Sequence, residues 1–94
     1  MSLSNKHAKY YSWLGVAYST QKQIKKERES YLKALKIDKN HLQSLVYLGH
    51  NYYETKEYQN AYKYYNRSLK LDLYNQIVLF NRAMTLKKLK RVPE

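Results

Sequence analysis

The chain has 94 residues, no cysteine, and 18 lysines and arginines against 7 aspartates and glutamates, so its formal net charge is +11. This length allows only a modest core, and the lack of cysteine excludes a disulfide framework and thiolate chemistry. The sequence contains neither a run of about 18 apolar residues nor an apolar N-terminal leader segment. We therefore expect one soluble, cytoplasmic domain over residues 1–94 without a membrane span.

The first predicted helix covers residues 6–20. Its apolar residues Tyr11, Leu14 and Tyr18 recur at spacings of three and four and so form one stripe on the helix. Gly15 lies in the same stripe. Because glycine weakens a helix relative to alanine, we expect a neighbouring helix to cross close against it.

The second predicted helix covers residues 24–37. Its inward set is Ile24, Tyr31, Ala34, Leu35 and Ile37, and its outward set is Lys25, Lys26, Lys33 and Lys36. Lys22 lies in the preceding turn, where a left-handed backbone costs a non-glycine residue roughly 1 kcal/mol. At the end of the helix, Asp38 can bond the turn backbone, and Asn40 is predicted to cap the next helix.

Three further helices are predicted, over residues 42–54, 58–71 and 76–89. Lys56 stands in the turn between the first two of them and repeats the earlier lysine turn. Asp72 and Asn75 repeat the turn chemistry of Asp38. We therefore interpret both aspartates as turn formers and not as catalytic carboxylates.

The sequence repeats itself with a period of 34 residues. The shift pairs Leu14 with Leu48, Gly15 with Gly49, Tyr18 with Tyr52, Lys22 with Lys56, Tyr31 with Tyr65, Lys33 with Arg67, Leu35 with Leu69, Lys36 with Lys70 and Asp38 with Asp72. A helix-turn-helix unit of this period, with Leu-Gly and then Tyr in its first helix and a small residue and an aromatic in its second, resembles the tetratricopeptide repeat.

The resemblance implies an all-α fold, an α-solenoid of antiparallel helical hairpins that winds into a right-handed superhelix. Five helices are expected, grouped as repeats over residues 8–41 and 42–75 and a partial repeat over residues 76–94. We expect the chain to be a piece of a longer repeat protein.

Glu27 departs from the family pattern, which has alanine at this position, as Ala61 does in the second repeat. The resemblance places this residue against Gly15. Because a charged side chain is not buried without a partner, we expect the first hairpin to splay or Glu27 to turn outward toward a lysine. Replacing Glu27 with alanine is then predicted to stabilise the protein.

The resemblance also implies a concave groove lined by the first helix of each repeat, which binds a peptide or helix of a partner. The implied lining is Lys9, Ser12, Trp13, Val16, Ser19, Gln43, Val46, Tyr47, His50, Tyr53, Glu54, Ile77, Phe80, Asn81, Met84 and Lys87. Such a module acts as an adaptor or scaffold in protein–protein interaction. The competing interpretation is that Trp13, Tyr47 and Tyr53 merely pack on neighbouring helices.

Catalysis is not supported by the sequence. His7, His41 and His50 share no metal-ligand spacing, and there is no glycine-rich phosphate loop. We expect a protein that is not an enzyme, with no cofactor and no metal.

The positive charge permits a second function, in which a basic surface binds nucleic acid or an anionic membrane. Lys33 with Arg67 and Lys36 with Lys70 would form its rungs on the outer face. Lys, Tyr and Asn are abundant together and share AT-rich codons, so base composition is an equally good explanation of the charge.

The fifth predicted helix follows the pattern of a first helix with no second helix to cover it. Leu79, Ala83 and Leu86 would rest on that missing helix. Because contiguous apolar surface tends to be covered, we expect either further native sequence or self-association through this end.

Overall fold

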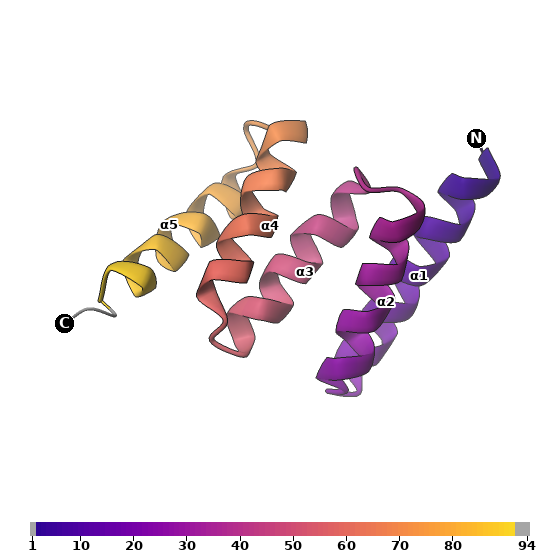
Figure 1. The fold of residues 1–94 in the computed structure, drawn as a ribbon, viewed down its shortest axis with the longest axis horizontal. Helices are drawn as coiled ribbons and strands as arrows, with labels where there is room; N and C mark the ends of the chain where they lie inside the picture. The colour runs from indigo at the N-terminus through magenta and orange to yellow at the C-terminus, as the bar shows by residue number, and fades with distance from the viewer. Residues whose placement is uncertain (1, 92–94) are drawn as a thin grey trace.

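A computed structural model describes residues 2–91 as five α-helices (Figure 1). The helices are α1 (Ser2–Thr20), α2 (Ile24–Ile37), α3 (Leu42–Glu54), α4 (Tyr58–Leu71) and α5 (Gln76–Arg91). Side chains are described for residues 6–90, whereas residue 1 and residues 92–94, the end of the predicted partial repeat, lie outside the described part. Residues 2–91 contain no strand, so the all-α prediction is confirmed.

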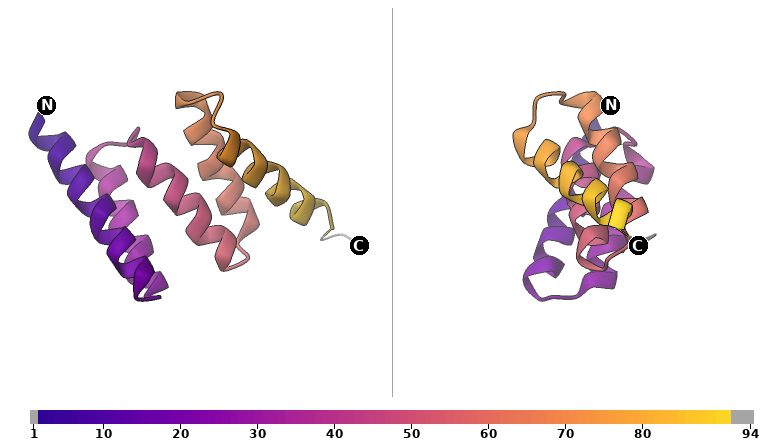
Figure 2. Two further views of the ribbon diagram at one scale, coloured as in Figure 1. Left: turned by 180° about the vertical axis from the view of Figure 1, so that it is seen from behind. Right: turned by 90° about the vertical axis from the view of Figure 1, so that its left-hand side faces the viewer.

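The helices form an elongated zigzag of about 47 × 29 × 19 Å. Each pair of successive helices packs together, from α1 with α2 to α4 with α5. Seen from behind, α1, α3 and α5 face the viewer, and α2 and α4 lie behind them (Figure 2, left). The molecule therefore has one side built by the first helices of the hairpins and an outer side built by the second helices.

The core consists of two clusters that follow the two repeats. The first contains Tyr31, Leu35, Leu45, Leu48 and Tyr64, and the second contains Ala61, Tyr65, Leu69 and Val78. Burying one such leucine contributes about 1.5–3 kcal/mol. The first cluster draws on α2, α3 and α4, and the second on α4 and α5 with partly buried residues of α3 packed against it, so each repeat is stabilised by the next helix along the chain.

Both glycines are packed against tyrosine rings of the following helix. A Cβ on Gly49 would lie 2.6 Å from Cε1 of Tyr65, and a Cβ on Gly15 would lie under 3.0 Å from three carbons of the Tyr31 ring. The predicted close crossing is confirmed, but its partner is the aromatic residue and not Glu27. The expected splaying of the first hairpin is wrong.

The turns adopt most of the conformations and caps that the sequence predicts. Lys22 and Lys56 adopt the predicted left-handed backbone, with φ of 60° and 64°. Asn75 Oδ1 accepts a hydrogen bond from the Val78 backbone at 3.0 Å and caps α5. The predicted cap by Asn40 is wrong, because its backbone N–H bonds Asp38 Oδ1 at 3.1 Å and a different residue, His41, occupies the N-cap.

The two end helices are longer than predicted. The first was expected from residue 6 and begins at Ser2, and the last was expected to end at residue 89 and ends at Arg91. The bounds of α2, α3 and α4 match the predicted ranges.

Candidate binding groove

Two hollows lie between the first helices of the hairpins. The N-terminal hollow, about 310 Å³, lies between α1 and α3. Its lining residues are Val16 and Ser19 of α1, Glu27 and Tyr31 of α2, and Tyr47, His50, Asn51 and Glu54 of α3.

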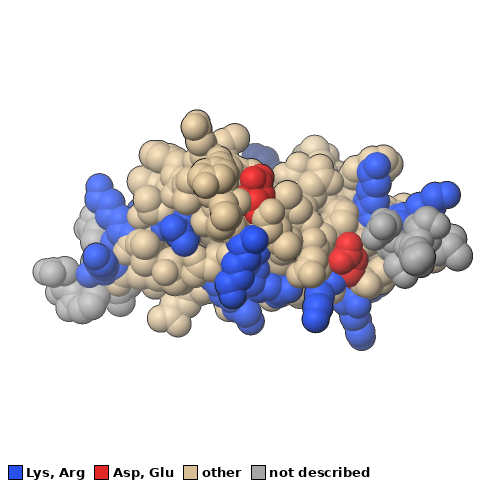
Figure 3. All heavy atoms as spheres, turned by 90° about the horizontal axis from the view of Figure 1, so that it is seen from above, with Lys and Arg blue, Asp and Glu red and all other residues tan. Residues whose placement is uncertain are grey.

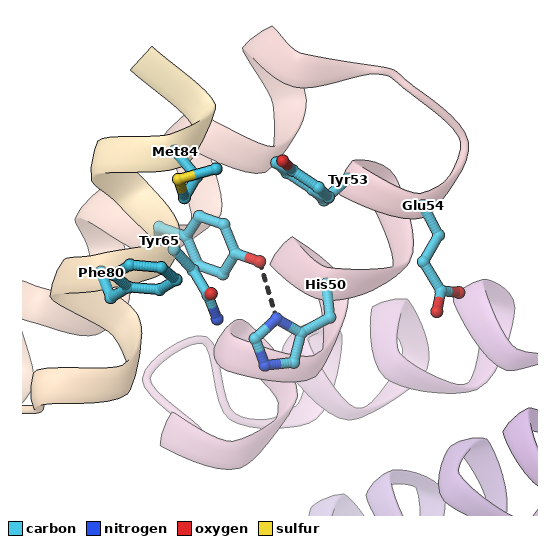
Figure 4. A pocket seen from close by; sticks show the side chains of 7 residues that line it. His50, Tyr53, Glu54, Tyr65, Phe80 and Met84 are labelled. Carbon is cyan, nitrogen blue, oxygen red and sulfur yellow. Dashed lines mark hydrogen bonds between the residues drawn. The ribbon is translucent and has the colours of Figure 1, made fainter. Parts of the chain in front are cut away.

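The C-terminal hollow, about 340 Å³, lies between α3 and α5 (Figure 4). Its lining residues are His50, Tyr53 and Glu54 of α3, Tyr65 of α4, and Phe80, Asn81 and Met84 of α5. Because His50 and Glu54 line both hollows, the two hollows adjoin along α3.

The hollows are one feature repeated at the 34-residue period. Val16 corresponds to His50, Ser19 to Tyr53, Tyr31 to Tyr65, Tyr47 to Asn81 and His50 to Met84. The backbone pattern therefore sets the place of each hollow, and the residues that fill equivalent positions set its chemistry.

Glu27 lies on the floor of the N-terminal hollow and is only 7% exposed. Its Oε2 accepts a hydrogen bond from the Tyr31 hydroxyl at 3.0 Å, and its Oε1 accepts one from Asn51 Nδ2 at 3.0 Å. Burial, and then the nearby Glu27 carboxylate, raise the pKa of Tyr31, which therefore stays protonated as a donor. The prediction that Glu27 turns outward is wrong, because two donors satisfy its carboxylate inside the protein.

Arg28 extends this network across the boundary between the repeats. Its Nε donates to Asn51 Oδ1 at 2.6 Å, and its Nη2 donates to Thr55 Oγ1 at 2.9 Å. The same Nη2 forms an ion pair with Glu57 at 3.0 Å, and the guanidinium lies 4.1 Å from the centre of the Tyr52 ring. The floor of the groove is therefore fixed by bonds that join α2 to α3 and to the start of α4.

His50 stands between the two hollows. Its Nδ1 lies 2.6 Å from the Tyr65 hydroxyl, the bond drawn in Figure 4. Burial lowers the pKa of His50, against an opposing effect of Glu54, and burial raises the pKa of Tyr65. Near neutral pH the pair therefore consists of a neutral imidazole and a neutral phenol.

The structure brings part of the predicted lining together. Members of the set that line a hollow are Val16, Ser19, Tyr47, His50, Tyr53, Glu54, Phe80, Asn81 and Met84. The members that line neither hollow are Lys9, Ser12, Trp13, Gln43, Val46, Ile77 and Lys87. Of these, Ser12 is fully buried and Val46 packs against the second core cluster, whereas Trp13 is 59% exposed beneath the Lys9 ammonium.

The tyrosines of the predicted groove have a double role. Tyr47 and Tyr53 are half-buried and pack against the core clusters, so the packing interpretation holds for part of each ring. Both rings also line a hollow. Trp13 is too exposed for a packing role to account for it.

Four lining residues were missed from the sequence: Glu27, Tyr31, Asn51 and Tyr65. Tyr31 and Tyr65 come from second helices, which the repeat pattern assigns to the outer layer. The glycines opposite them leave the space through which each ring reaches the groove. A glycine paired with a bulky aromatic sixteen residues later would have indicated this arrangement.

Eight of the 18 lysines and arginines lie on α2 and α4, the helices of the outer side. Figure 3 shows lysines and arginines along the side formed by α2 and α4 and at both ends of the molecule, with much of the opposite side uncharged. Several of these cations lie over tyrosine rings, among them Lys33 at 5.5 Å from the Tyr11 centroid and Arg67 at 5.4 Å from Tyr64. Arg67 also donates to the Lys39 carbonyl at 2.9 Å. The predicted rungs are thus partly occupied by intramolecular contacts.

The part of the chain that the structure describes offers no group of three His, Asp or Glu side chains placed to hold a metal ion. None of its helices combines the length and apolar character needed to cross a membrane.

The geometry defines an all-α repeat protein built from helical hairpins. Residues 8–41 match one family model of the tetratricopeptide repeat, and residues 43–75 match a second family model of the same repeat. The chain belongs to the tetratricopeptide repeat family, whose repeats are generally protein–protein interaction modules. A search of curated proteins gave no match.

Proposed function

We propose that this chain is a non-catalytic interaction module that binds a segment of another protein in the groove formed by α1, α3 and α5. The observation that carries the proposal is the pair of adjoining hollows, about 310 and 340 Å³, which share His50 and Glu54. Their aromatic walls and few polar groups suit a peptide or helix with protruding side chains. The module thereby acts as an adaptor.

Exposed aromatic residues along the groove supply its binding energy. Phe80 is 65% exposed at the rim of the C-terminal hollow, and Trp13, which lines neither hollow, is 59% exposed on α1. Aromatic side chains that become buried against a partner are the usual centres of binding energy at interfaces. Tyr53 adds a wall that is already held in place by its edge contact with Tyr58.

The test is selection of binders from a displayed library of random peptides, followed by affinity measurement with purified variants. Tyr53→Ala and Phe80→Ala are expected to weaken the selected peptides by about 1–2 kcal/mol each. The double variant Lys33→Ala with Arg67→Ala, on the outer side, is the matched control and is expected to change affinity little. Circular dichroism of each variant establishes that the helices remain.

The anionic-ligand function is the alternative outcome of the same measurements. If the outer-side double variant abolishes binding and affinity falls steeply with salt, the basic side of α2 and α4 is the binding surface. The groove proposal then fails.

We propose further that the apolar face of α5 that is exposed among the described residues packs against a second copy of the chain. Leu79 and Ala83 are exposed on this face, and Leu86 is half-buried. Covering them removes apolar surface from water. Sedimentation velocity at increasing concentration is expected to show dimers that Leu79→Lys abolishes. A chain that stays monomeric at every concentration contradicts the proposal.

A further inference from the structure

The lining of the N-terminal hollow has the opposite sign of charge to the molecule as a whole. The chain carries a net charge of +11, yet the hollow is lined by two carboxylates, Glu27 and Glu54. Among the described residues, no lysine or arginine lines it. A hollow of this kind therefore attracts a positively charged group locally, although the outer side repels one.

The two carboxylates differ in how they are held. Glu27 is fixed on the floor by Tyr31 and Asn51, one bond to each oxygen. A carboxylate oxygen has two acceptor positions, so each oxygen of Glu27 retains capacity for a further donor. Its place and its acceptor positions are thus set before a partner arrives.

Glu54 is exposed at the rim. No hydrogen bond or ion pair within the described residues engages its carboxylate. Figure 4 shows it directed away from Phe80 and Met84, toward the side of α1 and α2. Its charge therefore acts on the N-terminal hollow more than on the Phe80 and Met84 walls of the C-terminal one.

Aromatic walls complete the N-terminal hollow. The half-buried Tyr47 ring packs against the Tyr31 ring, which is only 1% exposed, with centroids 5.7 Å apart and a tilt of 31°, so Tyr47 is the ring that a partner can contact. A planar cation is attracted to the face of such a ring, and a guanidinium combines that contact with five N–H donors in a fixed fork. Carboxylates beside the Tyr47 ring therefore match an arginine side chain better than any neutral group.

The C-terminal hollow has different chemistry. Ala61 replaces Glu27 at the equivalent position, and Phe80, Met84 and Tyr53 form the walls, whereas Glu54 lies at the rim with its carboxylate directed away from Phe80 and Met84. A thioether and two rings favour an apolar side chain.

We propose that the groove recognises a partner segment that places a basic side chain, with arginine preferred over lysine, in the N-terminal hollow and an apolar side chain in the C-terminal hollow. This inference rests on the proposed function of the groove and adds the chemistry of the partner. A basic segment is the occupant that charge complementarity selects, since an acidic segment would meet Glu27 and Glu54.

The test uses the arginine-containing peptides selected from the random library, each labelled with a fluorophore, and the full chain. Arginine is replaced by citrulline, a neutral side chain of nearly the same shape, and fluorescence anisotropy gives the affinity. Citrulline is expected to weaken binding by about tenfold. In the Glu54→Gln variant, the same replacement is expected to weaken binding much less, because the peptide arginine no longer has the rim carboxylate as a partner.

The controls distinguish a failure of this inference from a failure of the proposal that the groove binds a segment of another protein. Glu29→Gln removes an exposed carboxylate of α2 outside both hollows and is expected to keep the full citrulline effect. Glu54 is exposed, so Glu54→Gln keeps the fold, and Glu27→Gln serves as the second variant.

Three results would overturn the inference. Peptides that depend on Phe80 or Tyr53 but bind equally well with citrulline, or selected peptides that are acidic, overturn it and leave the groove proposal standing. A library that gives no peptide dependent on Phe80 or Tyr53 overturns both.

Discussion

The two hollows occupy equivalent places but offer different chemistry. Tyr31 and Tyr65 lie at the same position of their repeats, each packed on a glycine. The hydroxyl of Tyr31 bonds Glu27 one helical turn earlier, whereas Tyr65 has Ala61 there and bonds His50 instead. The repeat thus fixes where the ring lies, and one neighbouring residue decides whether the floor beside it carries a carboxylate or an apolar side chain.

Ala61→Glu would transfer the carboxylate to the second repeat and is expected to give the largest effect. Ala61 is fully buried, and Thr85 stands in place of Asn51 with its hydroxyl already bonded to the Asn81 carbonyl. A buried charge without adequate partners costs about 3–5 kcal/mol. Urea unfolding measures the loss, with Ala17→Glu on the exposed side of α1 as the control. A loss below about 1 kcal/mol would show that the second hollow adapts to a carboxylate.

Glu27→Ala makes the first hollow resemble the second. The change leaves the Tyr31 hydroxyl without its acceptor and removes one bond of Asn51, so a loss of about 2 kcal/mol is expected. This reverses the stabilisation predicted from sequence. Glu29→Ala, an exposed carboxylate of the same helix, is expected to change stability little. A higher thermal midpoint for Glu27→Ala would restore the sequence-based prediction.

His50, which stands between the two hollows, is expected to make the stability of the protein depend on pH. Burial lowers its pKa below the ordinary value of 6.5, so the unfolded chain takes up a proton before the folded chain does. Stability is therefore full above about pH 6.5 and falls as pH decreases toward the lowered folded pKa. His50→Val, which copies the equivalent Val16, is expected to reduce the slope of thermal midpoint against pH.

His41 contributes to the same slope, because burial lowers its pKa too, against an opposing effect of Asp38. The slope that remains in His50→Val is therefore assigned by adding His41→Asn. An unchanged slope in His50→Val would show that His50 takes up its proton equally in both states.

The turns of the two repeats are alike and are expected to give the smallest effect. Lys22→Gly and Lys56→Gly relieve a left-handed backbone but add freedom to the unfolded chain, for a net gain of about 0.5 kcal/mol each. Lys22→Ala and Lys56→Ala keep the strain and are the controls. Equal stability of the glycine and alanine variants would show that the turn stores no strain.

The fold was predictable from sequence because the 34-residue period marks helices, turns and glycine crossings together. The hydrogen bonds on the floor of the groove were not predictable from the sequence. Whether Glu27 can be buried depends on its hydrogen bond from Asn51, which lies 24 residues away in the next repeat. The helical periodicity of the sequence does not indicate that these two residues are partners. The burial of Ser12 was missed for a related reason. The angle at which two helices pack decides whether a residue of the first helix faces the groove or the neighbouring helix, and the 34-residue period does not set that angle.

Arg28 has a consequence for how the chain unfolds. It ties α2 to Asn51, to the turn at Thr55 and to Glu57 ahead of α4, so opening the first repeat breaks bonds held by the second. In a linear array, stability is shared between units only through such nearest-neighbour contacts. The amide hydrogens of α2 and α3 should therefore exchange with solvent in a single cooperative event, and Arg28→Ala should split that event into two.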